Sequence, residues 1–194
     1  MNKTRLEAFS DGVLAIIITI MVLEFKVPEG ATFADLKPLL PKFLSYILSF
    51  IYIAIYWNNH HHLMHTVKQV NGKILWANLH LLFWLSLIPF VTAWNGENNF
   101  ASFPMMLYGI ILLMNGVAYY ILQTVILKHQ GKNSILKKAI GTDLKGKSSP
   151  ILYVIAVFFA NFYPIVSGVI YIFVALMWLV PDKRIERIFN ENEN

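Results

Sequence analysis

Residues 5–28 read RLEAFSDGVLAIIITIMVLEFKVP, a mainly apolar run that begins with a basic residue and ends at a proline. A helix of about 20 apolar residues crosses the roughly 30 Å of hydrocarbon in a bilayer. Glu29 and Gly30 follow Pro28, and a helix does not easily continue through this combination. The stretch therefore predicts a first membrane-spanning helix over 7–27.

The composition of the whole chain agrees with this interpretation. Of its 194 residues, 57% are hydrophobic and 14% are charged, whereas a soluble domain usually has about 25% charged residues. This composition excludes an ordinary soluble domain and a disordered or collagen-like chain. Because cysteine is absent, disulfides, thiolate chemistry and cysteine-based zinc sites are excluded as well. The chain is expected to be an integral membrane protein.

Further apolar runs predict one all-α membrane domain over 1–194. Five more spans are expected, at approximately 43–63, 74–94, 103–127, 149–161 and 163–181. The last two come from one apolar stretch of 30 residues, which would make about 45 Å of helix. That length is too long for one span and tight for two. Asn161 and Pro164 stand where a hairpin would turn, since proline suits the first turn of a new helix.

The distribution of basic residues favours six spans over five. With a cytoplasmic N-terminus, thirteen of the sixteen Lys and Arg residues fall on the inner side, and only Lys26, Lys37 and Lys42 fall outside. We expect a multi-pass protein of the cell membrane with both termini cytoplasmic and a short cytoplasmic tail at 182–194. The net charge of +5 is therefore attributed to the basic residues that orient the chain in the membrane, and no binding of nucleic acid is expected.

The first predicted helix has two different faces. At 100° per residue, one stripe comprises Arg5, Phe9, Gly12, Ile16, Thr19, Ile20, Leu23 and Val27. Ser10 and Asp11 point away from it. If the stripe lines a pathway, it offers rings of branched aliphatic side chains with one hydroxyl layer at Thr19. Alternatively, it packs against neighbouring helices and the Thr19 hydroxyl bonds to its own backbone.

Asp11 requires a partner in such a helix. An ionised carboxylate within a span costs about 2.5–3.5 kcal/mol unless it is paired or wetted. We expect Asp11 to be buried and to accept hydrogen bonds from imidazole or amide groups of 43–63 or 74–94. Either a structural role or a proton relay would explain it. The carboxylate also interrupts the apolar stretch, which argues against a cleaved signal peptide.

Four histidines cluster near the end of the second span, at His60, His61, His62 and His65. His61 and His65 have the i, i+4 spacing of a two-histidine metal pair, so a membrane metalloenzyme is one hypothesis. Membrane di-iron oxidases need several histidine clusters, however, and this chain has six histidines in all. We expect instead that one or two imidazoles bond to buried groups of the first helix, and that no metal is held.

The sequence Arg5-Leu6-Glu7-Ala8-Phe9-Ser10-Asp11 resembles the R-x-x-x-F-S-D signature on the first helix of the transmembrane protein 175 family. This family contains the endosomal and lysosomal potassium channels and their prokaryotic relatives. Similar residues continue at Ala15-Ile16-x-x-Thr19, Leu23-Glu24-x-x-Val27-Pro28, Trp57-x-x-His60-His61, Asn78 and Pro89-x-x-Thr92. The resemblance covers the first three spans well, and the last three in hydropathy and length.

The resemblance implies a homotetramer of six-helix subunits in which the first helices line one central potassium-permeable pore. Such a pore has no carbonyl-type selectivity filter. Ile16 is then the best match to the hydrophobic constriction, with Ile20 and Leu23 on the following turns and Thr19 as a hydroxyl layer. The implied partners are further copies of the chain, the lipid bilayer and potassium ions, with no cofactor and no enzyme activity.

The resemblance also implies that four motif residues hold the first helix in place through contacts with a histidine and an amide. The motif residues are Arg5, Phe9, Ser10 and Asp11, and their expected partners are His60 or His61 and Asn78. A second hypothesis remains open at this point. In it, the chain is a proton-linked transporter in which Asp11 and the His60–His65 cluster relay protons.

Overall fold

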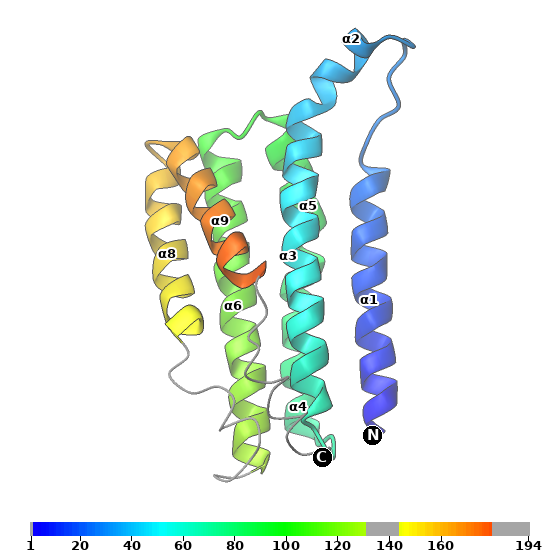
Figure 1. Ribbon diagram of the computed structural model, residues 1–194, viewed down its shortest axis with the longest axis vertical. Coiled ribbons are helices and arrows are strands. Elements are labelled where there is room, and N and C mark those ends of the chain that lie inside the picture. The colour runs from blue at the N-terminus through cyan, green and yellow to red at the C-terminus, as the bar shows by residue number, and fades with distance from the viewer. Residues whose placement is uncertain (1, 131–143, 180–194) are drawn as a thin grey trace.

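A computed structural model describes residues 2–130 and 144–179, and every regular element in these two ranges is a helix (Figure 1). Helix α1 (Lys3–Leu23) runs from the end of the bundle where the chain begins, here called the inner end, toward the opposite outer end. The expected tail at 182–194 and the last residues of the expected span at 163–181 lie outside the described residues.

The second long helix, α3 (Leu40–His65), returns from the outer end to the inner end. Two short helices precede it, α2 (Phe33–Leu36) and η1 (Lys37–Leu39), and they project beyond the rest of the bundle (Figure 1). Asp35 fixes the start of α2, because its Oδ2 accepts hydrogen bonds from the Thr32 backbone N–H at 2.9 Å and the Thr32 hydroxyl at 2.6 Å.

The third apolar segment, Gly72–Glu97, covers the span predicted over 74–94, but it is not one uninterrupted helix. It consists of α4 (Gly72–Ser86) and α5 (Ile88–Glu97) with Leu87 between them. Pro89 explains the break, since proline has no backbone N–H and its ring clashes with the carbonyl four residues earlier. The Thr92 hydroxyl donates to the Ile88 carbonyl at 2.7 Å in the turn that follows.

The C-terminal half contains α6 (Ser102–Gln130) and a hairpin of α8 (Leu144–Ala160) and α9 (Pro164–Leu179). The hairpin turns at 161–163, and Pro164 opens its second helix. The described parts of the hairpin helices have 17 and 16 residues, or about 25 Å each.

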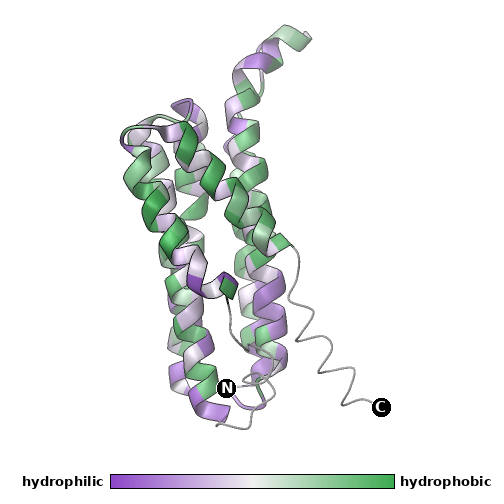
Figure 2. Cartoon of the chain, turned by 60° about the vertical axis from the view of Figure 1, so that its left-hand side comes forward, coloured by the Kyte–Doolittle hydropathy of each residue, from purple (hydrophilic) through white to green (hydrophobic). Residues whose placement is uncertain are grey.

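The predicted all-α membrane architecture with six helices is confirmed, and four of the six are long apolar spans. Among the described residues, the segments long and apolar enough to cross a membrane are Lys3–Leu23, Phe33–His65, Gly72–Glu97 and Ser102–Gln130. Figure 2 shows that these helices are mainly hydrophobic along their middle and more hydrophilic near the inner end.

Tyrosines attach the hairpin to the rest of the bundle. The Tyr52 hydroxyl donates to the Tyr171 carbonyl at 2.7 Å and accepts a hydrogen bond from the Tyr153 hydroxyl at 3.3 Å. The Tyr171 hydroxyl donates to the Met105 carbonyl at 3.0 Å and lies directly against Gly109, where a Cβ atom would not fit. The hairpin is therefore fixed to α3 and α6 by shape as well as by hydrogen bonds.

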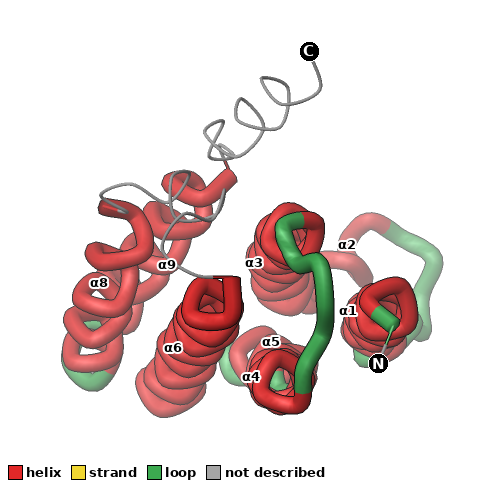
Figure 3. Tube along the Cα trace, turned by 90° about the horizontal axis from the view of Figure 1, so that it is seen from below, coloured by secondary structure: helices red, strands yellow, loops and turns green. Residues whose placement is uncertain are grey.

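Helix α1 lies at the edge of the bundle and packs against α3, α4 and α5 (Figure 3). Seen along the helices, α3 and the projecting α2 lie on one flank of α1, and the α4–α5 segment lies on the other flank. The hairpin lies on the far side of α6. This arrangement leaves the side of α1 that faces away from the bundle uncovered within one subunit.

Candidate ion pathway on the first helix

The two faces predicted for the first helix are clearly separated in α1. The buried residues follow the spacing of one helical face: Leu6, Ser10, Leu14, Ile17 and Met21. The residues of the predicted stripe lie on the other side, with 58% of Ile16, 41% of Ile20 and 80% of Leu23 exposed. Thr19 is exposed as well, and its hydroxyl donates to the Ile16 carbonyl at 2.8 Å. The oxygen of that hydroxyl keeps acceptor capacity toward the exposed side.

Three buried polar side chains join α1 to α3 and α4. The His60 ring donates from Nε2 to Asn78 Oδ1 at 2.6 Å, and Asn78 Nδ2 donates to Ser10 Oγ at 3.0 Å. The Ser10 hydroxyl then donates to the Leu6 carbonyl at 2.8 Å, one turn earlier in α1. Each donor in this chain has an acceptor, and bonds that run in one direction polarise one another. The chain fixes the rotation of α1 relative to its neighbours.

Asp11 differs from expectation in its burial. It lies on the flank of α1 beside Ser10 and is exposed in the single subunit, so the prediction of a buried Asp11 was wrong. It does have a partner, because Trp57 Nε1 on α3 donates to Asp11 Oδ1 at 3.0 Å. In the sequence, Trp57 belongs to the Trp57-x-x-His60-His61 resemblance, and no contact with Asp11 was predicted for it. The missed signal is its position one turn before His61 on the same face of α3.

The remaining motif residues and histidines lie around this centre without joining the buried chain of hydrogen bonds. Arg5 and Phe9 are exposed, and the described residues offer Arg5 neither a hydrogen bond nor an ion pair. His61 stacks on Trp57, with ring centroids 6.1 Å apart. His65 is exposed and lies one turn further on, with its ring centroid 6.4 Å from that of His61. Within the described ranges, no three His, Asp or Glu side chains gather closely enough to hold a metal ion.

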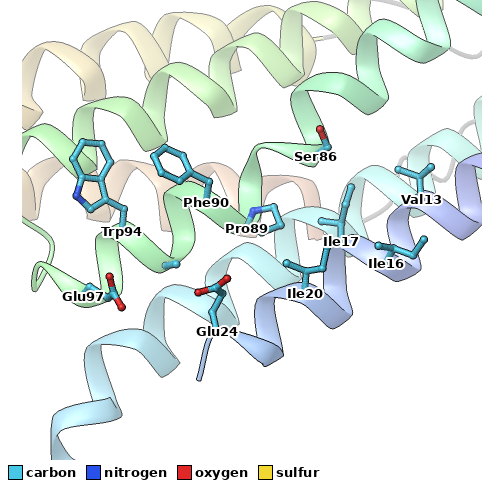
Figure 4. Close-up of a pocket in the computed structure, with 11 residues that line it drawn as sticks. Val13, Ile16, Ile17, Ile20, Glu24, Ser86, Pro89, Phe90, Trp94 and Glu97 are labelled. Atoms are coloured by element: carbon cyan, nitrogen blue, oxygen red, sulfur yellow. The ribbon is translucent and has the colours of Figure 1, made fainter. Parts of the chain in front are cut away.

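A cavity of about 620 Å³ lies between α1 and the α4–α5 segment (Figure 4). Ile16, Ile17 and Ile20 line it from α1, and Pro89, Phe90 and Trp94 line it from α5. Glu24 and Glu97 stand together at one end of it, near the outer end of the bundle. We call this cavity the α1–α5 groove. Sequence reasoning did not find it, because it depends on how two distant helices are placed.

A second polar cluster holds α5 against α3 and α6. The Ser45 hydroxyl donates to the Thr92 carbonyl at 2.8 Å, and the Ser49 hydroxyl lies 2.6 Å from the Thr92 hydroxyl and 2.9 Å from the Tyr108 hydroxyl. All four side chains are buried. The wall opposite α1 is thereby fixed by hydrogen bonds rather than by apolar contact alone.

Comparison with known proteins identifies the family. The family model described as endosomal/lysosomal potassium channel TMEM175 matches residues 5–89. A protein of Chryseobacterium sp., named as a potassium channel, is 60% identical over 192 residues, which are 99% of this chain and 100% of the relative. The chain belongs to the TMEM175 family. This membership makes it an ion-channel protein and not an enzyme, and the matched residues include α1 from Arg5 to its end.

More distant TMEM175 relatives agree in fold and sequence. The crystal structure of a lysosomal potassium-selective channel TMEM175 homolog from Chamaesiphon minutus superposes with a TM-score of 0.81 at 28% identity, covering 93% of this chain and 97% of that chain. The human protein named endosomal/lysosomal proton channel TMEM175 is 35% identical over 96 residues, which are 43% of this chain and 19% of the human one.

Proposed function

We propose that this TMEM175 protein is a potassium-permeable channel in which four copies of the chain place their α1 helices around one central axis. The observation that carries the proposal is the exposed stripe on α1, opposite a face fully packed against its own subunit. One helix cannot enclose a pathway, so a pore along this stripe requires several subunits with closed symmetry. The names and titles of the Chryseobacterium and Chamaesiphon relatives support potassium as the permeant ion.

The narrowest part of the proposed pore is a ring of Ile16 side chains, with Ile20 and Leu23 on the following turns. Aliphatic rings block flow by excluding water, and a small widening or a polar substitution admits hydrated cations. Thr19 places one hydroxyl layer between the apolar rings. The sequence contains no Thr-Val-Gly-Tyr-Gly segment, so no carbonyl-type filter is proposed and the preference for potassium over sodium should be modest.

The buried chain of hydrogen bonds from His60 through Asn78 to Ser10 supports a positioning role for these three residues. These side chains meet the buried face of α1 at Ser10 and hold the rotation of the helix, which decides whether Ile16 faces the axis. Asp11 and Trp57 add a contact on the flank of the same helix. We assign these residues to helix positioning and not to ion contact.

The charges at the two ends support an orientation in the cell membrane with the inner end in the cytoplasm. Lys3, Lys68 and Lys128 lie at or near helix ends on that side. Glu24, Glu29 and Glu97 lie at the opposite end together with Lys26, Lys37 and Lys42, and Lys42 pairs with Glu97 at 3.0 Å, so that end has no comparable basic excess. Basic residues accumulate on the cytoplasmic side of membrane proteins, so the proposal places both termini there.

The test is potassium flux from liposomes that hold the purified protein, together with its mass in the same detergent preparation. We expect a passive flux without any coupled ion and a mass of four chains. A preparation that conducts while it contains only monomers would contradict the proposed pore. Absence of flux from correctly assembled tetramers at every membrane potential applied would contradict the function.

A proton pathway is the second candidate, and the name of the human relative favours testing it. It would use Asp11 and the histidines of the His60–His65 segment, of which His61 and His65 are exposed. Membership in a channel family favours a proton-conducting channel over a coupled transporter. A pH-sensitive dye inside the same liposomes distinguishes the two ions when a potassium ionophore carries the compensating charge. A proton conductance then changes the internal pH, whereas a channel that conducts potassium alone leaves it unchanged.

A further inference from the structure

Large aromatic side chains are exposed on α3 at intervals of seven residues. They are Phe43, Phe50 and Trp57, each between 41% and 52% exposed. Seven residues are close to two helical turns, so the three rings form one row along the helix. Trp57 donates to Asp11 on α1, and the row therefore borders the flank of α1 that carries Asp11. We call it the α3 row.

A second aromatic row with the same spacing lies on the α4–α5 segment. Trp76, Phe83 and Phe90 are between 56% and 73% exposed, and they are the exposed large apolar side chains of this segment. Phe90 lines the α1–α5 groove together with Ile16 and Ile20 (Figure 4). The row therefore borders the groove side of α1. We call it the α4–α5 row.

The two rows lie on opposite flanks of α1. Figure 3 shows α3 on one side of α1 and the α4–α5 segment on the other. When subunits form a closed ring by rotation, each contact joins two different patches, one from each flank of the subunit. With α1 nearest the axis, the α3 row of one copy faces the α4–α5 row of the next. Lipid is a poor cover for the α3 flank, because Asp11 and His61 are exposed on it as well.

Hydrogen bonds within the subunit fix the level of each row along the bundle. Asn78 bonds to Ser10, and Trp57 bonds to the next residue of α1, Asp11. Trp76 precedes Asn78 by two residues and lies nearer the inner end. At a rise of about 1.5 Å per residue, Trp57 therefore lies about 4.5 Å nearer the outer end than Trp76.

The levels near the outer end give a similar offset. The Ser45 hydroxyl donates to the Thr92 carbonyl. Phe43 lies two residues outward of Ser45, and Phe90 lies two residues inward of Thr92, so Phe43 is about 6 Å outward of Phe90. Each row repeats about every 10.5 Å, and the offset is about half of this repeat. A rotation about an axis along the helices keeps every level, so the rings of one row fall between the rings of the other.

Small residues stand at the levels where the rings of the α3 row arrive. Ser86 separates the last two rings of the α4–α5 row, and Ala93 follows the last ring by three residues. Both of them line the α1–α5 groove. By the levels above, Phe50 lies within about 1.5 Å of the level of Ser86, and Phe43 lies equally close to the level of Ala93. The groove thus has space where a neighbouring copy brings large rings.

We propose that the α3 row of each copy interlocks with the α4–α5 row of the next copy. Phe50 of one copy lies against Ser86 of the next, and Phe83 of that next copy lies against Ala54 of the first. Close packing of this kind drives helix association in a bilayer. The contact rests on the proposed function, since it requires α1 to be the innermost helix. It fills the α1–α5 groove with rings of the neighbouring copy, which support the back of the pore-lining helix.

Cross-linking between chains tests the register of this contact, because the sequence has no cysteine of its own. Two forms of the chain with tags of different length are co-expressed, one with Phe50→Cys and the other with Ser86→Cys. A thiol cross-linker with a reach of a few ångströms should give a covalent dimer that contains both tags.

Two control variants replace Ser86→Cys in this experiment. Leu79→Cys lies seven residues earlier in α4, on the same face but about 10 Å nearer the inner end. Ile172→Cys is exposed on the hairpin helix α9. Neither control should give a mixed dimer with Phe50→Cys.

An exchange of side-chain size provides the second measurement. Phe50→Ala removes a ring from the contact and Ser86→Phe overfills the space that receives it, so each should lower the fraction of tetramer in detergent. The double variant should restore that fraction. Ile172→Ala is the matched control, because it shortens an exposed apolar side chain on α9, and it should leave the fraction unchanged.

The outcomes separate this contact from the proposed function. Tetramers that conduct but give no mixed dimer with Ser86→Cys, or that give as much with Leu79→Cys, would overturn the interlocked rows and leave the proposed function standing. Monomers that conduct would overturn both. If a lipid-soluble maleimide labels Ser86→Cys in intact tetramers as fast as it labels Ile172→Cys, lipid covers the α4–α5 row and the contact is overturned.

Discussion

The N-terminal and C-terminal halves of this protein both expose apolar helix faces, but they hold their helices in different ways. Helix α1 is attached on one side by a directed chain of polar side chains, His60 to Asn78 to Ser10. The α8–α9 hairpin is attached by tyrosines, by Gly109 and by close packing. The exposed apolar faces of the two halves therefore suit different neighbours. On the hairpin the apolar face suits lipid, whereas on α1 it adjoins hydroxyl and carboxylate groups that lipid would not favour.

The family model matches nearly the same N-terminal half, since the matched residues 5–89 end at Pro89 in α5. Polar groups that connect helices restrict substitution more than apolar contacts do, because an unpaired buried polar group costs about 1–3 kcal/mol. We therefore expect substitutions in the two halves to differ in kind, with the C-terminal half sensitive to volume and the N-terminal half sensitive to hydrogen bonding.

The largest effect on folding is expected at Gly109. A Cβ atom there would overlap the Tyr171 ring and contact Val157, so Gly109→Ala should cost on the order of 3 kcal/mol by forcing the hairpin away from α6. Gly72→Ala is the matched control, because Gly72 lies at the start of α4, away from the proposed pore, and no atom lies within 4 Å of its added Cβ. Thermal unfolding in detergent measures both. Equal melting temperatures for the two variants would show that the hairpin is not held by this close fit.

A smaller effect is expected from Asn78→Leu, which leaves the buried His60 ring without its acceptor and removes the donor to Ser10. The cost should be about 2 kcal/mol, with a loss of tetramer. Asn115→Leu is the control in the other half. Its Oδ1 is buried without a partner and its Nδ2 donates only to backbone carbonyls, so this variant should be nearly neutral. The comparison fails if Asn115→Leu is the more damaging of the two in the same unfolding assay.

The smallest effect on stability is expected from Asp11→Asn. An asparagine Oδ1 can still accept the hydrogen bond from Trp57 Nε1, and Asp11 is exposed, so the change should be below about 1 kcal/mol. Potassium preference should also be unchanged, since Asp11 lies on the flank of α1. Bi-ionic reversal potentials measure this preference. A stable variant with altered preference would place Asp11 in the pathway, and loss of proton flux alone would favour the proton candidate.

Much of the fold follows from the sequence because hydropathy and proline positions act locally. The six-helix architecture, the two faces of α1 and the turn before Pro164 all depend on residues close together in the chain. The break at Leu87 was missed, although Pro89 is visible, because a proline inside a span can kink a helix or end it. The prediction that Asp11 is buried was wrong because a helical wheel shows the direction in which a side chain points. It does not show how far a neighbouring helix extends over that side chain.

The groove and the Trp57 contact could not be predicted for a different reason. Both depend on the relative placement of helices that are distant in sequence, such as α1 and α5. Hydrophobic periodicity shows which side of a helix avoids water, but it does not distinguish a face covered by lipid from one covered by another subunit. The resemblance of residues 5–11 to a known signature supplied the pore hypothesis that periodicity alone left open.

The central claim is that the Ile16 face of α1 lines the pore, and the flux of sodium and potassium through an Ile16→Asn variant tests it most directly. A ring of asparagine side chains around the pore would favour a hydrated path, so the sodium and potassium fluxes should both rise and the difference between them should narrow. Leu23→Asn should give the same effect or a weaker one. Ile172→Asn is the matched control, because it is 49% exposed on α9, and it should leave both fluxes unchanged. If Ile16→Asn and Leu23→Asn leave conductance and ion preference unaltered in assembled protein, the pore is not lined by this face.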